Sequence, residues 1–132
     1  MTDQPASFRA LGDERFVSLT TFRRNGAPVP TAVWVARDGD DLVVITPDGS
    51  GKVKRVRNSG RVELRPCSRS GAVADGAPTF AGHATVTDET GTAQVRELIR
   101  RAYGFEYRVV MLIERIAARG QKPRVGLRIT AV

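Results

Sequence analysis

The stretch that decides the fold is residues 47–66, PDGSGKVKRVRNSGRVELRP, in which a turn leads into a run of cations and then into a strand. Residues 61–65 alternate charged and apolar side chains, the pattern of a strand with one buried face. The turn offers the Ser50 hydroxyl and glycine N–H groups, followed by Lys52, Lys54 and Arg55. Charge, short donors and close backbone approach are what a phosphate site needs. A short helix over residues 51–58 with a solvated basic face fits the same residues, and the composition leaves both interpretations open.

The residues before this stretch predict a short helix around residues 8–11 and then three strands over residues 15–47. Asn25-Gly26 and Asp38-Gly39 mark hairpin turns, because these residues tolerate the positive φ of type I′ turns. Residues 42–45 form a continuous apolar run, which indicates a central strand covered on both faces.

The residues after it predict a loop at 68–79, a strand at 80–88, two helices and a last strand at 124–132. Asp88 or Thr90 can cap the first helix, and Gly104 ends it. The second helix stops at Gly120. The residues expected to face inward are Val95, Leu98, Ile99 and Ala102 on the first helix, and Val109, Leu112, Ile113 and Ile116 on the second.

This order of elements predicts a mainly β protein with helices, of the α+β class, formed by residues 1–132 as one domain. Short hairpin links favour an antiparallel sheet. About six such strands would close into a small barrel with the helices packed against one side. No early helix separates the strands, which argues against a parallel doubly wound sheet.

The composition points away from catalysis by protein side chains. The chain has one histidine, His83, and one cysteine, Cys67, so we expect no disulfide and no metal site. His83 is expected at the surface and Cys67 as a small buried thiol. Neither a G-x-S-x-G nor a phosphate-binding Walker motif occurs. An enzyme with this sequence would depend on a bound cofactor.

The net charge of +7 suits an anionic partner of some kind, although nearly all the cations are arginine, which GC-rich codon usage also favours. Only 6% of the residues are aromatic, and no strand sets aromatic side chains beside alternating cations, so we predict no nucleic-acid partner. The sequence shows no signal peptide and no apolar run long enough to span a bilayer. We therefore expect a cytoplasmic protein without a membrane partner.

Residues 43–66, VVITPDGSGKVKRVRNSGRVELRP, resemble the strand, phosphate turn, helix and strand of the pyridoxamine 5′-phosphate oxidase-like split-barrel family. Thr46, Ser50, Lys52 and the NSGRV of residues 58–62 match positions of that motif. The resemblance implies a six-stranded antiparallel FMN-binding split barrel with flanking helices. It also implies a homodimer whose cofactor sites lie at the subunit interface.

Within that family the chain looks closest to the small actinobacterial branch that uses the deazaflavin coenzyme F420. PVPTAVW at residues 28–34, the SGKVKR turn and RPCSRSG at residues 65–71 carry this resemblance. The Arg and Lys that serve FMN phosphate in the family's oxidases are absent near residues 30–35. This departure favours a longer cofactor tail bound by Lys52, Lys54, Arg55 and Arg57.

The function implied is an F420-dependent oxidoreductase that transfers hydride between the reduced deazaflavin and a small organic substrate, with FMN or FAD as the alternative cofactor. Trp34 would line the substrate pocket or pack in the core. Tyr103, Tyr107 and His83 are nominal proton donors, and no catalytic residue is assigned. The implied cofactor-binding residues are Thr31, Ala32, Val33, Thr46, Ser50, Gly51, Lys52, Lys54 and Arg55.

Two other interpretations compete with the enzyme. The same fold could serve as a non-catalytic carrier of the cofactor or of a tetrapyrrole, which would bind its ligand without turnover. A small basic barrel could also bind single-stranded nucleic acid, and steep salt dependence of such binding would favour that interpretation.

Overall fold

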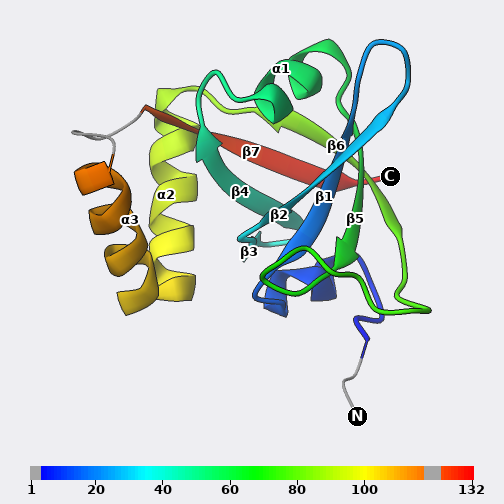
Figure 1. Ribbon diagram of the computed structural model, residues 1–132, viewed down its shortest axis with the longest axis horizontal. Coiled ribbons are helices and arrows are strands. Elements are labelled where there is room, and N and C mark those ends of the chain that lie inside the picture. The colour runs from blue at the N-terminus through cyan, green and yellow to red at the C-terminus, as the bar shows by residue number, and fades with distance from the viewer. Residues whose placement is uncertain (1–3, 118–122) are drawn as a thin grey trace.

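The computed structural model describes residues 4–117 and 123–132, and in them one antiparallel sheet of seven strands curls around a core (Figure 1). The strand order is β2-β1-β5-β6-β7-β4-β3, and every neighbouring pair is antiparallel. In chain order the elements are the 3-10 helix η1 (Arg9–Asp13), β1 (Val17–Phe22), β2 (Pro28–Val33), β3 (Ala36–Asp38), β4 (Asp41–Pro47), α1 (Gly51–Asn58), β5 (Arg61–Pro66), β6 (Phe80–Val86), α2 (Glu89–Tyr103), α3 (Phe105–Ala117) and β7 (Arg124–Ala131).

The strand count differs from the expected six because the middle strand of the three predicted before residue 47 is broken. It forms β2 and β3, which are separated by Trp34 and Val35 and lie at opposite ends of the sheet. A link of two residues between the two sheet edges requires the sheet to curl until those edges approach. The break is therefore the corner that closes the barrel.

The turns and the central strands follow the sequence patterns closely. The β1–β2 hairpin turns at Gly26 (φ 88°), as predicted. The β3–β4 turn is centred one residue later than predicted, on Gly39 and Asp40, because Asp38 pairs with Asp41. All residues from Leu42 to Thr46 are buried, which confirms a central strand covered on both faces.

Two apolar clusters lie on the two faces of the curled sheet. The cluster inside the barrel includes Leu19, Val44, Leu64 and Leu127, all fully buried. The predicted alternation in residues 61–65 is confirmed, because Val62 and Leu64 point into this cluster. The second cluster lies between the sheet and α2, whose Val95 and Ile99 pack against strand residues Ala36, Val43 and Ile45.

Helix α2 begins and ends where the sequence predicts. The Asp88 Oδ1 accepts a hydrogen bond of 2.7 Å from the Gly91 N–H at its N-terminus. Gly104, with φ 56°, ends it. The expectation that Ala102 faces inward is wrong: it lies on the exposed side of the last turn. No helix in the described part of the chain is long and apolar enough to cross a membrane.

Helix α3 departs most from the prediction. Val109, Leu112 and Ile113 were expected to face inward, yet 37%, 58% and 60% of their surfaces are exposed, and Phe105 is 80% exposed. The reason is the order of layers: α2 covers the sheet, and α3 lies on the outer side of α2 (Figure 1). The side chain of Ile116 and the expected stop at Gly120 lie outside the described residues.

Candidate functional site

The end of β2, the end of β4, the start of α1 and one side of α3 enclose a cavity of about 240 Å³, which we name the Lys52 cavity. Five of the predicted site residues meet there, although they come from three separate segments of the chain. Its lining residues are Phe16, Ala32, Val33, Trp34, Ile45, Thr46, Pro47, Lys52, Val110, Met111 and Arg124.

One end of the Lys52 cavity is polar and cationic. The Lys52 ammonium donates a hydrogen bond of 3.0 Å to the Thr46 hydroxyl, which is only 2% exposed. Burial lowers the pKa of Lys52, and the positive charges of Arg55 and Arg124 lower it further. Burial also lowers the pKa of Arg124. A bound anion would relieve both effects, because it solvates buried cations that water reaches poorly.

The rest of the Lys52 cavity is apolar and aromatic. The ring of Trp34 stacks on that of Tyr103, with centroids 4.5 Å apart and planes 13° from parallel. Val33 and Ile45 belong to the strands on either side. A planar ring system with one anionic end fits this division between an apolar wall and a cationic end.

The edge strand β2 supplies main-chain groups to the same cavity. It pairs only with β1, so the residues along it alternately direct their N–H and C=O groups toward β1 and away from it. Ala32 and Val33, which the sequence analysis predicted to bind the cofactor ring, line this cavity. Thr31 is not among the lining residues, and its hydroxyl makes a long contact of 3.4 Å with the Leu19 carbonyl oxygen.

The turn before α1 holds an unsatisfied hydroxyl. Ser50 occupies the N-cap position of α1, but its side chain makes no capping hydrogen bond. Its Oγ is shielded from solvent and has no hydrogen-bond partner. A buried hydroxyl without a partner is costly unless a ligand or water completes it. This orphaned group, one residue from the α1 N-terminus, fits a phosphate-binding turn.

Lys54 and Arg55, two of the other cations predicted to bind the cofactor, line a different cavity of about 440 Å³, which we name the Lys54 cavity. Arg57, also predicted to hold the cofactor tail, lines neither this cavity nor the Lys52 cavity. Residues two apart on a helix point about 200° apart, so Lys52 and Lys54 face different sides of α1. The Arg55 Nε donates a hydrogen bond of 2.7 Å to the Thr21 hydroxyl. The lining residues of the Lys54 cavity are Phe22, Arg23, Arg24, Gly51, Lys54, Arg55 and Asn58.

The three nominal proton donors do not line the Lys52 cavity. The Tyr103 hydroxyl is 2.9 Å from the Val35 N–H, which donates to it, and 2.8 Å from the Val35 and Arg15 carbonyl oxygens. Tyr107 is buried against Trp34. His83 is exposed on β6, as predicted. Tyr103 therefore has a structural role at the barrel corner.

Sequence reasoning missed several lining residues, of which Arg124 is the most important. It stands at the start of β7, directly opposite Pro47 in the register of the β4–β7 pair. Nothing near Arg124 in the sequence marks it as a ligand-binding residue, and only the pairing of the last strand with β4 places it there. Phe16, before β1, and Val110 and Met111, on α3, were also missed, because their place beside the cavity depends on contacts between distant segments of the chain.

A third cavity continues from the Lys52 cavity along α3. It has a volume of about 630 Å³ and shares Phe16, Trp34 and Val110 with the Lys52 cavity, and we name it the Phe105 cavity. At its rim the Glu106 carboxylate forms ion pairs with Arg15 and Arg69. The other lining residues are Phe105, Val109 and Ile113.

Comparisons with known proteins concern the chain as a whole. The family model described as pyridoxamine 5′-phosphate oxidase matches residues 3–132. No curated protein sequence matches the chain.

Three solved structures illustrate the range of proteins that share the fold. An F420 reductase is 17% identical, with a TM-score of 0.58, and the alignment covers 97% of this chain and 95% of that one. HutZ, the heme storage protein of Vibrio cholerae, is 14% identical, with a TM-score of 0.65 and coverage of 90% and 82%. A FAD-binding protein from Mesorhizobium loti is 17% identical, with a TM-score of 0.59 and coverage of 92% and 82%.

Proposed function

The chain belongs to the pyridoxamine 5′-phosphate oxidase family, and from that premise we propose that it is an F420-dependent oxidoreductase of the actinobacterial deazaflavin branch. It transfers hydride between the reduced coenzyme and a small organic substrate. The observation that carries the proposal is the Lys52 cavity, where residues from β2, β4 and α1 predicted to bind the cofactor line one space. A fold neighbour is an F420 reductase, which supports a deazaflavin among the possible cofactors.

Residues of the Lys52 cavity, together with Ser50 in the turn before α1, fit such a cofactor group by group. Lys52 and the Thr46 hydroxyl bind its phosphate, and the orphaned Ser50 hydroxyl completes the phosphate-binding turn. Main-chain groups of Ala32 and Val33 on the edge strand bind the polar edge of the ring. The bound deazaflavin supplies the hydride-transfer carbon, which no side chain of this protein could replace. The protein binds and orients the ring and excludes water from it.

We propose further that the working form is a homodimer with the site at its interface. The support is the apolar surface formed by Phe105, Val109, Leu112 and Ile113 on α3, which is exposed in the single chain. Large exposed apolar patches mark interaction surfaces. This one continues through the Phe105 cavity to Trp34 at the Lys52 cavity, so a second copy seated on α3 would also wall the site.

Two alternative functions can be tested by the same ligand titration. FMN or FAD would use the same phosphate end, and a fold neighbour is a FAD-binding protein. A tetrapyrrole carrier is the second alternative, since another neighbour is a heme storage protein. A carrier would bind its ligand without turnover.

The deciding experiment is a titration of the purified protein with F420, FMN, FAD and haem, followed through Trp34 fluorescence. We expect selective binding of F420, weakened about tenfold to a hundredfold by Lys52→Ala, because one charge-assisted hydrogen bond is lost. Lys54→Ala is the matched control, because it removes the same charge from the same helix but from the Lys54 cavity.

If the protein prefers FMN or FAD, F420 is the wrong cofactor, and the proposed binding site stands. Selective haem binding without redox turnover would favour the carrier. Binding of no ligand at all would refute the proposed function.

A further inference from the structure

The Phe105 cavity, of about 630 Å³, is the larger of the two cavities that meet at Trp34. It shares Phe16, Trp34 and Val110 with the Lys52 cavity, so a molecule in one cavity would lie next to a molecule in the other. A ring bound in the Lys52 cavity would therefore have its reaction partner in the Phe105 cavity.

Trp34, which lines both cavities, is fixed in place by two other rings. Its ring stacks on that of Tyr103 at 4.5 Å and lies 6.4 Å from that of Tyr107, centroid to centroid. The Tyr103 hydroxyl is in turn hydrogen-bonded to main-chain groups of Val35 and Arg15. A side chain held in this way gives a pocket the rigid surface that selection by shape requires.

The lining of the Phe105 cavity is apolar except at one end. Of the described residues that line it, only Arg69 and Glu106 are polar, and the others are aliphatic or aromatic. A pocket with an apolar wall and a few charged groups at one place binds an apolar molecule that carries a single polar group.

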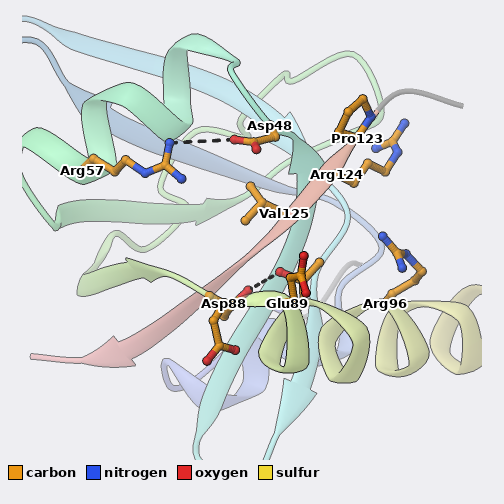
Figure 2. Close-up of a pocket in the computed structure, with 10 residues that line it drawn as sticks. Asp48, Arg57, Asp88, Glu89, Arg96, Pro123, Arg124 and Val125 are labelled. Atoms are coloured by element: carbon orange, nitrogen blue, oxygen red, sulfur yellow. Dashed lines mark hydrogen bonds and ion pairs between the residues drawn. The ribbon is translucent and has the colours of Figure 1, made fainter.

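The cavity in Figure 2 has the opposite character. It lies between the turn before α1, the start of α2 and the start of β7, and charged and hydroxyl side chains form most of its wall. Figure 2 shows Asp48 and Arg57 as an ion pair there, 3.8 Å apart. Its described lining includes neither Trp34 nor any residue of α3. An apolar molecule beside the ring therefore fits the Phe105 cavity and not this one.

The polar end of the Phe105 cavity favours an anion over a cation. The Glu106 carboxylate accepts from Arg15 through Oε2 and from Arg69 through Oε1, the latter at 3.3 Å. Both oxygens are thus engaged, and the cluster keeps one positive charge in excess. The Arg69 side chain is 81% exposed, and within the described residues it donates only to Glu106, so its other N–H groups can bind a ligand.

A tight turn sets the position of Arg69. The Gly71 N–H donates a hydrogen bond of 2.9 Å to the Ser68 carbonyl oxygen. Just before this turn, the Cys67 N–H donates to the Phe16 carbonyl oxygen at 3.3 Å. Since Phe16 lines both cavities, this bond attaches the turn to their shared wall, and Arg69 is held at the rim of the Phe105 cavity.

We propose that the Phe105 cavity binds the substrate, and that the substrate is an apolar molecule with one carboxylate, which Arg69 binds with the help of Arg15. The cavity's role as a substrate site rests on the proposed function, because the hydride is exchanged with a cofactor ring in the Lys52 cavity. Planar guanidinium groups match a carboxylate in shape and charge, so Arg69 is the residue that selects for the acid. The second copy proposed to cover α3 would close the cavity against solvent.

The first test uses three probes with the same apolar body: naphthylacetate, naphthylethanol and naphthylethylamine, substituted at the same ring position. Each is titrated by calorimetry into the full chain without cofactor. We expect the acid to bind about fivefold more tightly than the alcohol, as a partly screened ion pair allows, and the amine to bind more weakly than the alcohol. Equal binding of the acid and the alcohol, or binding of no probe, would overturn the proposal.

Variants of the charged cluster then separate selection from structure. Arg69→Gln should reduce the preference for the acid to about twofold or less and leave the alcohol unchanged. Glu106→Gln removes the negative charge of the cluster, so it should strengthen binding of the acid alone, whereas a merely structural role of the ion pairs predicts a loss for all three probes. Arg9→Gln is the matched control, because it removes an exposed arginine and its ion pair with Asp40 and does not line this cavity.

An unchanged preference in Arg69→Gln would contradict the assignment. A loss of acid binding confined to Lys52→Ala would place the probe in the Lys52 cavity and overturn it as well.

The second test repeats the titration of naphthylacetate on the protein loaded with F420. We expect the two to bind together, with the affinity for the probe within about twofold of that without cofactor, because their cavities are neighbours. Displacement of the probe by F420 would overturn the proposal. If the protein binds none of F420, FMN and FAD while the preference for the acid still depends on Arg69, the proposed function fails and the acid-binding cavity stands.

Discussion

Removal of the Tyr103 hydroxyl should destabilise the corner that closes the barrel. This hydroxyl accepts a hydrogen bond from the Val35 N–H at 2.9 Å and can donate to either the Val35 or the Arg15 carbonyl oxygen, each 2.8 Å away. Val35 is 1% exposed and belongs to the two-residue link between β2 and β3, so water cannot replace the tyrosine there. The bonds attach the end of α2 to that link.

The expected magnitude follows from these contacts. Tyr103→Phe retains the ring that stacks on Trp34, so the packing changes little. It leaves the Val35 N–H buried without a partner, which costs about 1–3 kcal/mol, and removes one bond to a carbonyl oxygen, worth about 1 kcal/mol. We expect the free energy of unfolding to fall by about 2–4 kcal/mol. For a chain of this length that corresponds to a decrease in Tm of about 7–14 °C.

The assay is urea unfolding followed by far-UV circular dichroism, with an unchanged m value expected. Tyr107→Phe is the matched control, because Tyr107 also packs against Trp34, whereas the hydrogen bonds to the Val35 link come from Tyr103. A loss of less than about 0.5 kcal/mol for Tyr103→Phe, or a loss no larger than that of the control, would show that the corner does not depend on this hydroxyl.

Three further predictions test the cofactor end, the interface and a helix terminus. Burial lowers the pKa of Lys52 from 10.5, and a bound anion favours the charged form, so the affinity for inorganic phosphate should fall as the pH rises through that lowered pKa. In calorimetry, Lys52→Arg should shift this fall in affinity to higher pH. A wild-type affinity that does not depend on pH would contradict the role of Lys52. Ile113→Glu, on the exposed apolar surface of α3, should convert a dimer to a monomer in sedimentation, and a wild type that is already monomeric would refute the homodimer. Asp88→Ala should reduce the free energy of unfolding by about 1 kcal/mol in urea, since it removes the cap on the Gly91 N–H, and an unchanged midpoint would contradict that capping role.

Local patterns predicted most of the fold. The alternation at residues 61–65, the apolar run at 42–45, the cap at Asp88 and the stop at Gly104 all describe interactions within a few residues of the chain, and the structure contains each of them. The errors occurred where a distant element decides the outcome. The break at Trp34 and Val35 exists because the barrel must close, and nothing in residues 28–38 shows where the opposite sheet edge lies.

For the candidate site, too, local sequence predicted some residues correctly, and contacts between distant segments decided the others. The sequence predicted Thr46, Ser50 and Lys52 as binding residues because turn, hydroxyls and cation are close together in the chain, and Thr46 and Lys52 do line one cavity. It grouped Lys54 and Arg55 with them for the same reason, although the structure places them in a cavity of their own. The homodimer, the choice of F420 over other cofactors and the cytoplasmic location remain predictions.

By itself the sequence determined which segments become strands and helices and that a turn with a hydroxyl, glycines and cations precedes α1, because periodicity, capping and turn chemistry are local properties of a chain. Binding of a phosphate by that turn remains a prediction. Only the tertiary structure decided that Arg124 joins Lys52 at one cavity and that α3 leaves Phe105, Val109, Leu112 and Ile113 exposed. The physical reason is that strand register and layer order arise from contacts between residues far apart in the chain. Pairing of β7 with β4 sets Arg124 opposite Pro47. Because α2 covers most of this face of the sheet, α3 packs there only through the side that carries Tyr107 and Met111.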